Sequence, residues 1–136
     1  MDKLVVDSSV WIDFFNKKTS PQIEKIKEFI LADFTESRIL ILPVILQEVL
    51  QGIQDDKAYS IIKETIQGFN YPQFEIYHTA IKAADLFRFL RKKGVTIRKA
   101  NDCLIAAICI EIDLKLMHND KDFDNIAKYT SLKIYK

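Results

Sequence analysis

The sequence predicts an α/β protein in which helices cover both faces of a central parallel sheet of about four to five strands. Two observations predict this fold class. Short apolar segments alternate with longer amphipathic segments along the chain, with no internal repeat or linker between them. The first of the short segments is β-branched and starts almost at residue one, as expected of a strand buried on both faces. The 136 residues are the usual size of one domain, so we expect a single domain over residues 1–136.

The candidate strands share a short apolar run that ends at turn-forming or helix-starting residues. They are Leu4–Val6, Ile39–Leu42, Phe74–Tyr77, Leu114–Met117 and Leu132–Tyr135. The first two are expected in the buried middle of the sheet, and the third at an edge. Pro43 ends the second strand, because proline cannot continue a buried ladder and is well suited to the first turn of a helix.

Apolar residues at helical spacing, together with capping signals, predict helices between these strands. The helices are expected over residues 10–15, 21–30, 44–52, 55–69, 79–93, 102–110 and 123–129. Thr79 is expected to cap the fifth, whose small inner-face residues indicate close packing on the sheet; that face is Ala80, Ala83, Ala84, Phe87 and Leu90. The same helix should end at Arg91–Gly94, because cations favour a helix C-terminus and glycine permits the reversal.

Composition limits the class of protein. Hydrophobic residues make up 49%, enough for a packed core, and the formal net charge of +1 excludes a strongly basic nucleic-acid coat but not a nuclease. The N-terminus lacks the features of a signal peptide, and no apolar run approaches the roughly 20 residues that span a bilayer. Cys103 and Cys109 lie on different faces of one predicted helix and are poor disulfide partners. We therefore expect a cytoplasmic protein with reduced thiols.

Acidic residues recur where strands end and helices begin. Asp7 follows the first strand, Asp102 opens a buried helix, and Asp120 and Asp122 follow the strand at 114–117. If those two strands are neighbours, these acids meet at the rim where open α/β sheets bind ligands. Glu48 lies on an apolar helix face, where an acid is usually paired or a metal ligand.

Carboxylates gathered at one rim repel each other, which favours a bound cation. Oxygen ligands without convergent histidine or cysteine indicate Mg²⁺ or Mn²⁺, an ion that activates water for attack on a phosphodiester. The alternative is structural: each acid taken alone is an ordinary helix cap, first-turn acid or turn former. Their shared placement in one alternating pattern favours the metal site.

Cations and aromatic side chains lie near these acids. Arg98 and Lys99 come just before Asp102, and our hypothesis is that they flank the site and contact substrate phosphates, the alternative being a solvated polar turn. Trp11, Phe14 and Phe15 are expected to pack in the core, with base stacking or receipt of a partner helix as alternatives. His78 and His118 lack partner ligands in the sequence, and we expect structural roles for both.

Four segments resemble those of the PIN-domain ribonucleases, and within them the VapC-type toxins of toxin–antitoxin pairs. In order they read LVVDSSVWIDFF, LILPVILQEVLQG, GVTIRKANDCLIAAICIE and LKLMHNDKDFDNIAKYTSLKIY, and together they span the chain. The resemblance implies a PIN-like three-layer α/β/α fold and a metal-dependent endoribonuclease. It also implies a homodimer and an antitoxin that inserts a segment into the active-site groove.

The same resemblance implies a set of site residues. Asp7, Glu48, Asp102 and Asp120 would form the catalytic Mg²⁺ or Mn²⁺ site. Asp122 matches the second acid of the closing turn, so Asp120, Asp122 or both would reach the metal. Ser8 matches the family's positioning serine or threonine after the first acid and is expected at the substrate.

Other classes remain as alternatives. A phosphatase of the haloacid dehalogenase type needs an aspartate two residues after the first acid, where this chain has Ser9. A receiver-like signalling module needs a phospho-accepting aspartate after a middle strand, yet the second strand ends in Leu42, Pro43 and Val44. A non-catalytic PIN or receiver-like metal-binding interaction module is the alternative to the nuclease.

Overall fold

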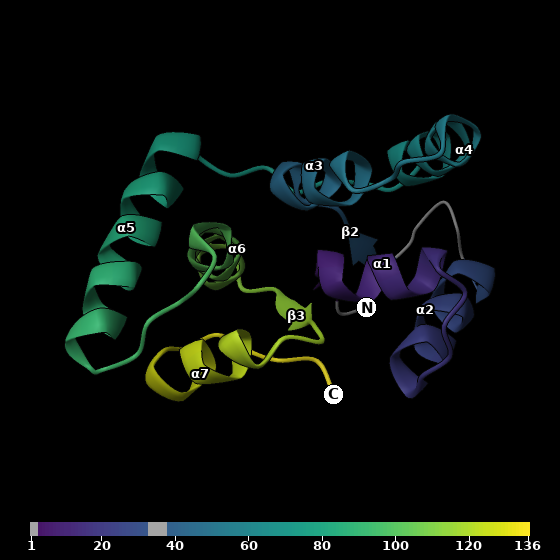
Figure 1. Ribbon diagram of the computed structural model, residues 1–136. Helices are drawn as coiled ribbons and strands as arrows, with labels where there is room; N and C mark the ends of the chain where they lie inside the picture. The colour runs from purple at the N-terminus through teal and green to yellow at the C-terminus, as the bar shows by residue number, and fades with distance from the viewer. Residues whose placement is uncertain (1–2, 33–37) are drawn as a thin grey trace.

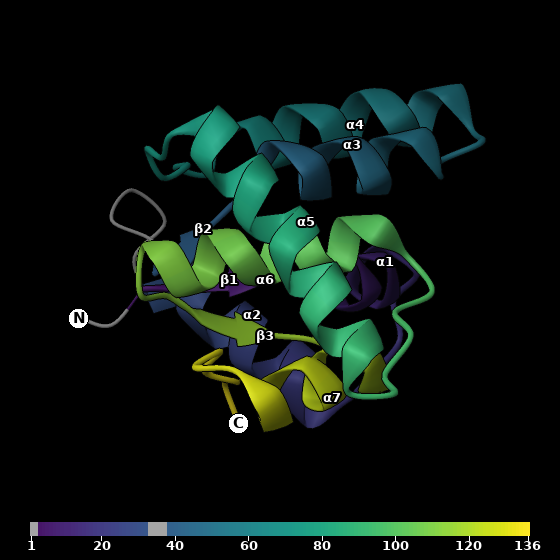
Figure 2. The same ribbon diagram turned by 90° about the vertical axis from the view of Figure 1, so that its left-hand side faces the viewer.

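A computed structural model describes residues 3–32 and 38–136 of the chain. Its sheet lies between helices, with α1 (Ser8–Phe15) and α2 (Pro21–Ala32) on one side (Figure 1). On the other side lie α6 (Ala100–Glu111) and, outside it, α5 (Ile76–Lys92), which faces the viewer in Figure 2. The expected three layers, with helices on both faces of a sheet, are confirmed.

The sheet is parallel and is organised around its first strand. β1 (Leu4–Val6) pairs with β2 (Ile39–Leu40) on one side and with β3 (Lys115–Met117) on the other. All three residues of β1 are buried, which explains its β-branched and fully apolar sequence. The first strand and the strand at 114–117 are therefore neighbours, which is the condition under which sequence analysis expected the acids to meet at one rim.

Fewer strands form than the four to five expected: the described residues make a sheet of three. The second strand stops at Leu40, two residues earlier than expected. The C-terminal segment makes one isolated bridge, Ile134 with Leu116, in which Leu116 N donates to Lys133 O at 2.9 Å. At the opposite edge, Asn70 bridges Leu40.

The predicted edge strand at Phe74–Tyr77 and the predicted Thr79 cap are both wrong. The carboxylate of Glu75 accepts hydrogen bonds from the amides of Tyr77 and His78, so Glu75 caps α5, which begins at Ile76. Thr79 is buried one turn inside the helix, where its hydroxyl donates to Glu75 O at 3.0 Å. The side-chain cap satisfies amides at the helix start that a strand would leave unpaired.

α5 packs on α6 and not on the sheet. Of the expected inner face of α5, Leu90 is fully buried and Phe87 partly buried, whereas Ala80 and Ala84 are exposed. α6 is buried on nearly every side because it lies between the sheet and α5, as Figure 2 shows. The predicted end of α5 is confirmed: Gly94 has a φ of 82°, the left-handed conformation that glycine adopts without strain.

The remaining helices lie at the two ends of the sheet. α3 (Pro43–Gln51) and α4 (Asp56–Gln67) lie beyond β2, and α7 (Lys121–Tyr129) lies beside β3 (Figures 1 and 2). Pro43 occupies the first turn of α3 as expected.

Within the described ranges, none of the helices combines the length and the apolar character that crossing a membrane requires.

Candidate metal centre and the adjoining groove

The two neighbouring strands β1 and β3 place acids at the same edge of the sheet. Asp7 directly follows β1 and caps α1, and Asp120 follows β3 and caps α7. The two turns are joined by a backbone hydrogen bond of 2.9 Å from Asp7 N to Met117 O. Asp102 lies in the first turn of α6. The chain therefore brings its candidate acids to the carboxyl ends of parallel strands.

Three of the predicted acids form a tight cluster. One carboxylate oxygen from each of Asp102, Asp120 and Asp122 lies within 4.8 Å of the others. Asp102 and Asp122 are 3% and 5% exposed, so the cluster is buried on its inner side. Like charges this close disfavour ionisation unless a cation joins them.

The predicted acids Asp7 and Glu48 lie outside this tight cluster but act on it. Burial, which contributes most, and the charges of Asp7 and Asp120 together raise the pKa of Asp102 to about 7. Lys99 opposes that shift, and Glu48 adds a smaller rise. The carboxyl of Asp102 is therefore partly protonated near neutral pH, although its ordinary pKa is near 4.

Two buried carboxylate oxygens lack hydrogen-bond partners among the described residues, namely Asp7 Oδ1 and Asp102 Oδ2. A buried acceptor without a partner costs free energy, and such groups are uncommon in folded proteins. A divalent cation would satisfy both oxygens and offset the repulsion between the acids. The donor set consists of carboxylate oxygens, which suits a hard cation. The residues present therefore fit a divalent metal ion.

The two serines after Asp7 have different partners. Ser8, which we expected at the substrate, donates from its hydroxyl to Glu48 Oε1 at 3.2 Å. Ser9 contacts Asp7 instead, through both its amide and its hydroxyl. Sequence analysis considered Ser9 only as a helix cap, a position that Asp7 occupies, and gave it no role at the site. The signal was present: an aspartate that caps a helix often accepts a hydrogen bond from the amide two residues later.

Arg98 and Lys99 form ion pairs with acids of the cluster, so they flank the site. Arg98 Nε lies 3.3 Å from Asp122 Oδ2, and Arg98 Nη2 lies 3.5 Å from Asp120 Oδ1. Lys99 Nζ lies 3.9 Å from Asp120 Oδ2. Both cationic side chains are largely exposed, so they border the cluster on its open side.

His118 supports the turn that carries two of the acids. The amide of Asp120 donates to His118 Nδ1 at 3.0 Å, so the ring proton is on Nε2 and points to Asp124 Oδ1, also at 3.0 Å. His78 pairs with Glu111 at 3.3 Å on the surface. Both histidines thus have structural partners.

Burial raises the pKa of Cys103 to about 11 and that of Cys109 to about 12, so neither free thiol is suited to act as a nucleophile.

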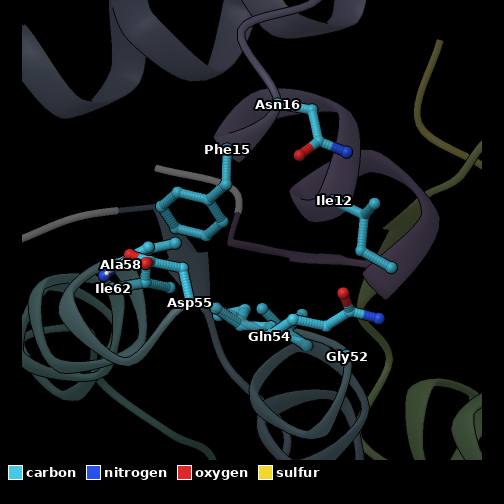
Figure 3. A pocket seen from close by; sticks show the side chains of 10 residues that line it. Ile12, Phe15, Asn16, Gly52, Gln54, Asp55, Ala58 and Ile62 are labelled. Carbon is cyan, nitrogen blue, oxygen red and sulfur yellow. Dashed lines mark hydrogen bonds between the residues drawn. The ribbon is translucent and has the colours of Figure 1, made fainter.

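A groove runs between α1 and the α3–α4 pair. Figure 3 shows Ile12, Phe15 and Asn16 on one wall, facing side chains of the segment from Gly52 to Ile62. Its volume is about 390 Å³. Ile12 and Gly52 each lie one helical turn beyond Ser8 and Glu48, which are hydrogen-bonded to each other, so the groove adjoins the acidic site.

The aromatic residues of α1 divide between the core and this groove. Trp11 is fully buried and stacks on Phe15 with ring centroids 5.8 Å apart. Its ring also lies near the tilted ring of Phe69, with centroids 5.3 Å apart. Trp11 therefore belongs to the core, as expected, and it holds Phe15 in place as part of the groove wall.

Comparison with known proteins identifies relatives over nearly the whole chain. The sequence model of the PIN domain matches residues 4–129. VapC ribonuclease Mb1587 of Mycobacterium bovis and ribonuclease VapC11 of Mycobacterium tuberculosis are each 29% identical over 130 residues. Each of these alignments covers 96% of this chain and 96% of the relative.

Solved structures share the fold. The DNA-bound VapBC of Salmonella typhimurium contains a chain that superposes with a TM-score of 0.77 at 19% identity, covering 99% of this chain and 98% of that one. The VapBC2 structure from Rickettsia felis, bound to a promoter DNA fragment, gives a TM-score of 0.74 at 18% identity, covering 97% and 96%. At these identities the likeness establishes the fold.

Proposed function

Because this chain belongs to the PIN-domain family, we propose that it is a metal-dependent endoribonuclease and the toxin of a VapBC-type toxin–antitoxin pair. Relatives named as VapC ribonucleases match it over 96% of its length, which supports this activity. The observation that carries the proposal is the cluster of Asp102, Asp120 and Asp122, with buried oxygens of Asp102 and Asp7 that lack hydrogen-bond partners in the part of the chain that the structure describes. The proposal treats residues 1–136 as one catalytic domain.

Asp7, Glu48, Asp102, Asp120 and Asp122 would hold Mg²⁺ or Mn²⁺. When bound, such an ion polarises a phosphoryl oxygen of RNA and lowers the pKa of an attacking water. Asp102 would have to lose its proton to serve as a ligand, and because its pKa is raised to about 7, the proton would compete with the ion near neutral pH. Ser8 holds Glu48 by its hydroxyl. Arg98 and Lys99 turn from Asp120 and Asp122 toward the phosphates of the substrate.

The proposal is tested by incubating the purified protein with a mixed set of labelled RNAs. We expect internal cleavage with Mg²⁺ or Mn²⁺ and none with EDTA. Cleavage that persists in EDTA would refute the metal dependence of the proposed activity. The lack of cleavage with every RNA and either metal would refute the proposed endoribonuclease activity itself. Metal binding without any cleavage would favour the alternative, a non-catalytic metal-binding PIN module.

Charge reversal at Arg98 is expected to slow RNA cleavage by roughly 10–100-fold at saturating metal, because it removes a charge-assisted phosphate contact. The measurement is the initial rate on one labelled RNA for Arg98→Glu. The matched control is Arg91→Glu, at the exposed end of α5. Equal rates for both variants and the wild type would exclude phosphate binding by Arg98.

The groove beside the site suits a peptide segment of the antitoxin better than it suits RNA. Most of its lining is apolar, including Ile12, Phe15 and Ile62, which Figure 3 labels. Val49 and Ile53 belong to the same lining. An apolar wall offers little to phosphates but buries the apolar face of a helix well. A segment lying there ends next to Ser8 and Glu48, where it would block the acids.

Ile12→Glu is therefore expected to weaken binding of the cognate antitoxin by about 10–100-fold, because a charge replaces a buried apolar contact. Calorimetric titration of the antitoxin into each variant measures the change. Ile61→Glu is the control, since Ile61 is exposed on the same helix as Ile62 but does not line the groove. Equal affinities for the two variants would place the antitoxin elsewhere.

A homodimer is a further part of the proposal. The outer surface of α5 exposes Ile76, Tyr77 and Ile81 at 73%, 81% and 61%. Exposed apolar groups gathered on one helix are typical of an interface.

In sedimentation velocity we expect a dimer for the wild type and a monomer for Ile81→Glu, with Leu31→Glu on α2 as the control. A wild type that stays monomeric at all concentrations would contradict this.

The proposal places the protein in the cytoplasm, where RNA is present and the thiols of Cys103 and Cys109 stay reduced.

A further inference from the structure

We propose that Ser9 is a positioning residue of the metal site, which fixes the carboxylate of Asp7 and joins it to the turn that carries Asp120. The inference rests on the proposed function, because it concerns how the same site is built. Sequence analysis gave the positioning role to Ser8, whose hydroxyl is instead bound to Glu48.

Ser9 makes two hydrogen bonds to one oxygen of Asp7. Its amide donates to Asp7 Oδ2 at 3.1 Å, and its hydroxyl donates to the same atom at 2.6 Å. The second bond is short, as expected when a hydroxyl donates to an ionised carboxylate. A carboxylate held twice at one oxygen cannot rotate freely about its last side-chain bond.

The same hydroxyl is fixed from the other side. Ser9 Oγ accepts a hydrogen bond of 3.0 Å from the amide of Asn119, the residue directly before Asp120. A hydroxyl has a single proton, so accepting from Asn119 leaves that proton for Asp7. One side chain thus joins the end of β1 to the turn after β3, although the two segments are 110 residues apart.

This arrangement decides which oxygen of Asp7 faces the site. With Oδ2 occupied by Ser9, Asp7 Oδ1 is left buried without a hydrogen-bond partner among the described residues. Asp7 is 4% exposed, so bulk water does not satisfy that oxygen either. Ser9 therefore presents Asp7 as a ligand with one free oxygen, already oriented before an ion binds.

Other side-chain contacts hold the acid turn but do not touch the carboxylate of Asp7. Gln22 Nε2 donates to the carbonyl of His118 at 2.6 Å, and Asn119 Nδ2 donates to Asp13 at 3.2 Å. These bonds tie the turn to α2 and α1, and they remain when Ser9 is changed. Loss of the Ser9 hydroxyl should therefore loosen Asp7 and the spacing between Asp7 and Asp120 without unfolding the turn.

Hydrogen bonds that orient metal ligands are typically worth roughly 10–100-fold in metal affinity. The test is calorimetric titration of Mn²⁺ into the full-length wild type, Ser9→Ala, Ser9→Thr and Ser60→Ala. Ser60 is an exposed serine of α4 whose hydroxyl donates only to the backbone of its own helix, so it is the matched control. Ser9→Ala should bind Mn²⁺ at least about tenfold more weakly, while Ser9→Thr, which keeps the hydroxyl, regains most of the loss.

Two further measurements separate positioning from general stability. RNA cleavage by Ser9→Ala should need at least about tenfold more Mn²⁺ for half-maximal rate, with the KM for RNA unchanged. The melting temperature of metal-free Ser9→Ala should stay close to that of Ser60→Ala. Unchanged Mn²⁺ affinity in Ser9→Ala, beside a wild type that binds metal and cleaves RNA, overturns this inference alone. A wild type that neither binds metal nor cleaves RNA overturns the proposed function, and the inference with it.

Discussion

Asp102→Asn is expected to lower the rate of RNA cleavage by about 10³-fold or more, equivalent to about 4 kcal/mol of transition-state stabilisation. Asp102 interacts with all the other candidate acids. It belongs to the tight cluster, and the negative charges of Asp7 and Glu48 also raise its pKa. Asparagine keeps the shape of the side chain but removes its charge and one oxygen ligand. Initial rates at saturating Mg²⁺ and Mn²⁺ measure the loss.

The control for this variant is Asp85→Asn, the same change at an exposed acid of α5. It should cleave RNA at the wild-type rate. Because every variant is purified in the same way, the comparison also excludes a contaminating nuclease. Cleavage by Asp102→Asn within tenfold of the wild type would mean that the acid cluster is not the catalytic site.

Asp102 is also expected to make the stability of the metal-free protein depend on pH. Its folded-state pKa of about 7 lies above the ordinary value of 3.8, so the folded state binds more protons than the unfolded state between these values. Stability is therefore lost as pH rises from the lower value through the higher one. Unfolding by urea in EDTA should show a loss of about 3 kcal/mol between pH 5 and pH 8 from this group.

The difference between the wild type and Asp102→Asn isolates this contribution, because all other groups titrate in both. At pH 8 in EDTA, the variant should be more stable by about 3 to 4 kcal/mol and melt roughly 10 °C higher. Saturating Mn²⁺ should remove most of the difference by stabilising the wild type alone. A wild type and variant with equal stability at both pH values would show that Asp102 is not destabilised by its surroundings.

The positions of the acids follow from the sequence because strand ends and helix starts were marked by short-range signals. Asp7 follows the buried β1, and Asp102 opens the long apolar α6. The parallel arrangement then brings them to one edge of the sheet. That Asp102, Asp120 and Asp122 cluster there, close enough to Asp7 and Glu48 for their charges to raise the pKa of Asp102, depends on the pairing of β1 with β3. Sequence analysis stated that pairing only as a condition, because alternation of elements does not fix the order of strands.

The start of α5 could not be predicted in the same way. Phe74 to Tyr77 has the composition of a strand, and glutamate is not among the preferred helix caps, so the pattern favoured an edge strand. Tertiary contacts decided otherwise, because Thr79 is buried one turn into the helix. Likewise, the nearly uniform apolar character of α6 required cover on its outer side, and α5 provides it.

The roles of the two serines also needed the structure. Both follow Asp7, and either hydroxyl can reach an acid from the first turn of a helix. What distinguishes them is Asn119, whose amide lies beside Ser9 only after β3 has paired with β1. Long-range neighbours of this kind leave no trace in a local sequence pattern.

The central claim is that these acids bind catalytic divalent metal, and the most direct measurement is the anomalous scattering of Mn²⁺ soaked into crystals of the wild-type protein. We expect an anomalous peak within bonding distance of Asp102 and of other acids among Asp7, Asp120 and Asp122, and no such peak in Asp102→Asn. A wild-type crystal in saturating Mn²⁺ with no peak among these acids, or with its peak elsewhere, would contradict the account.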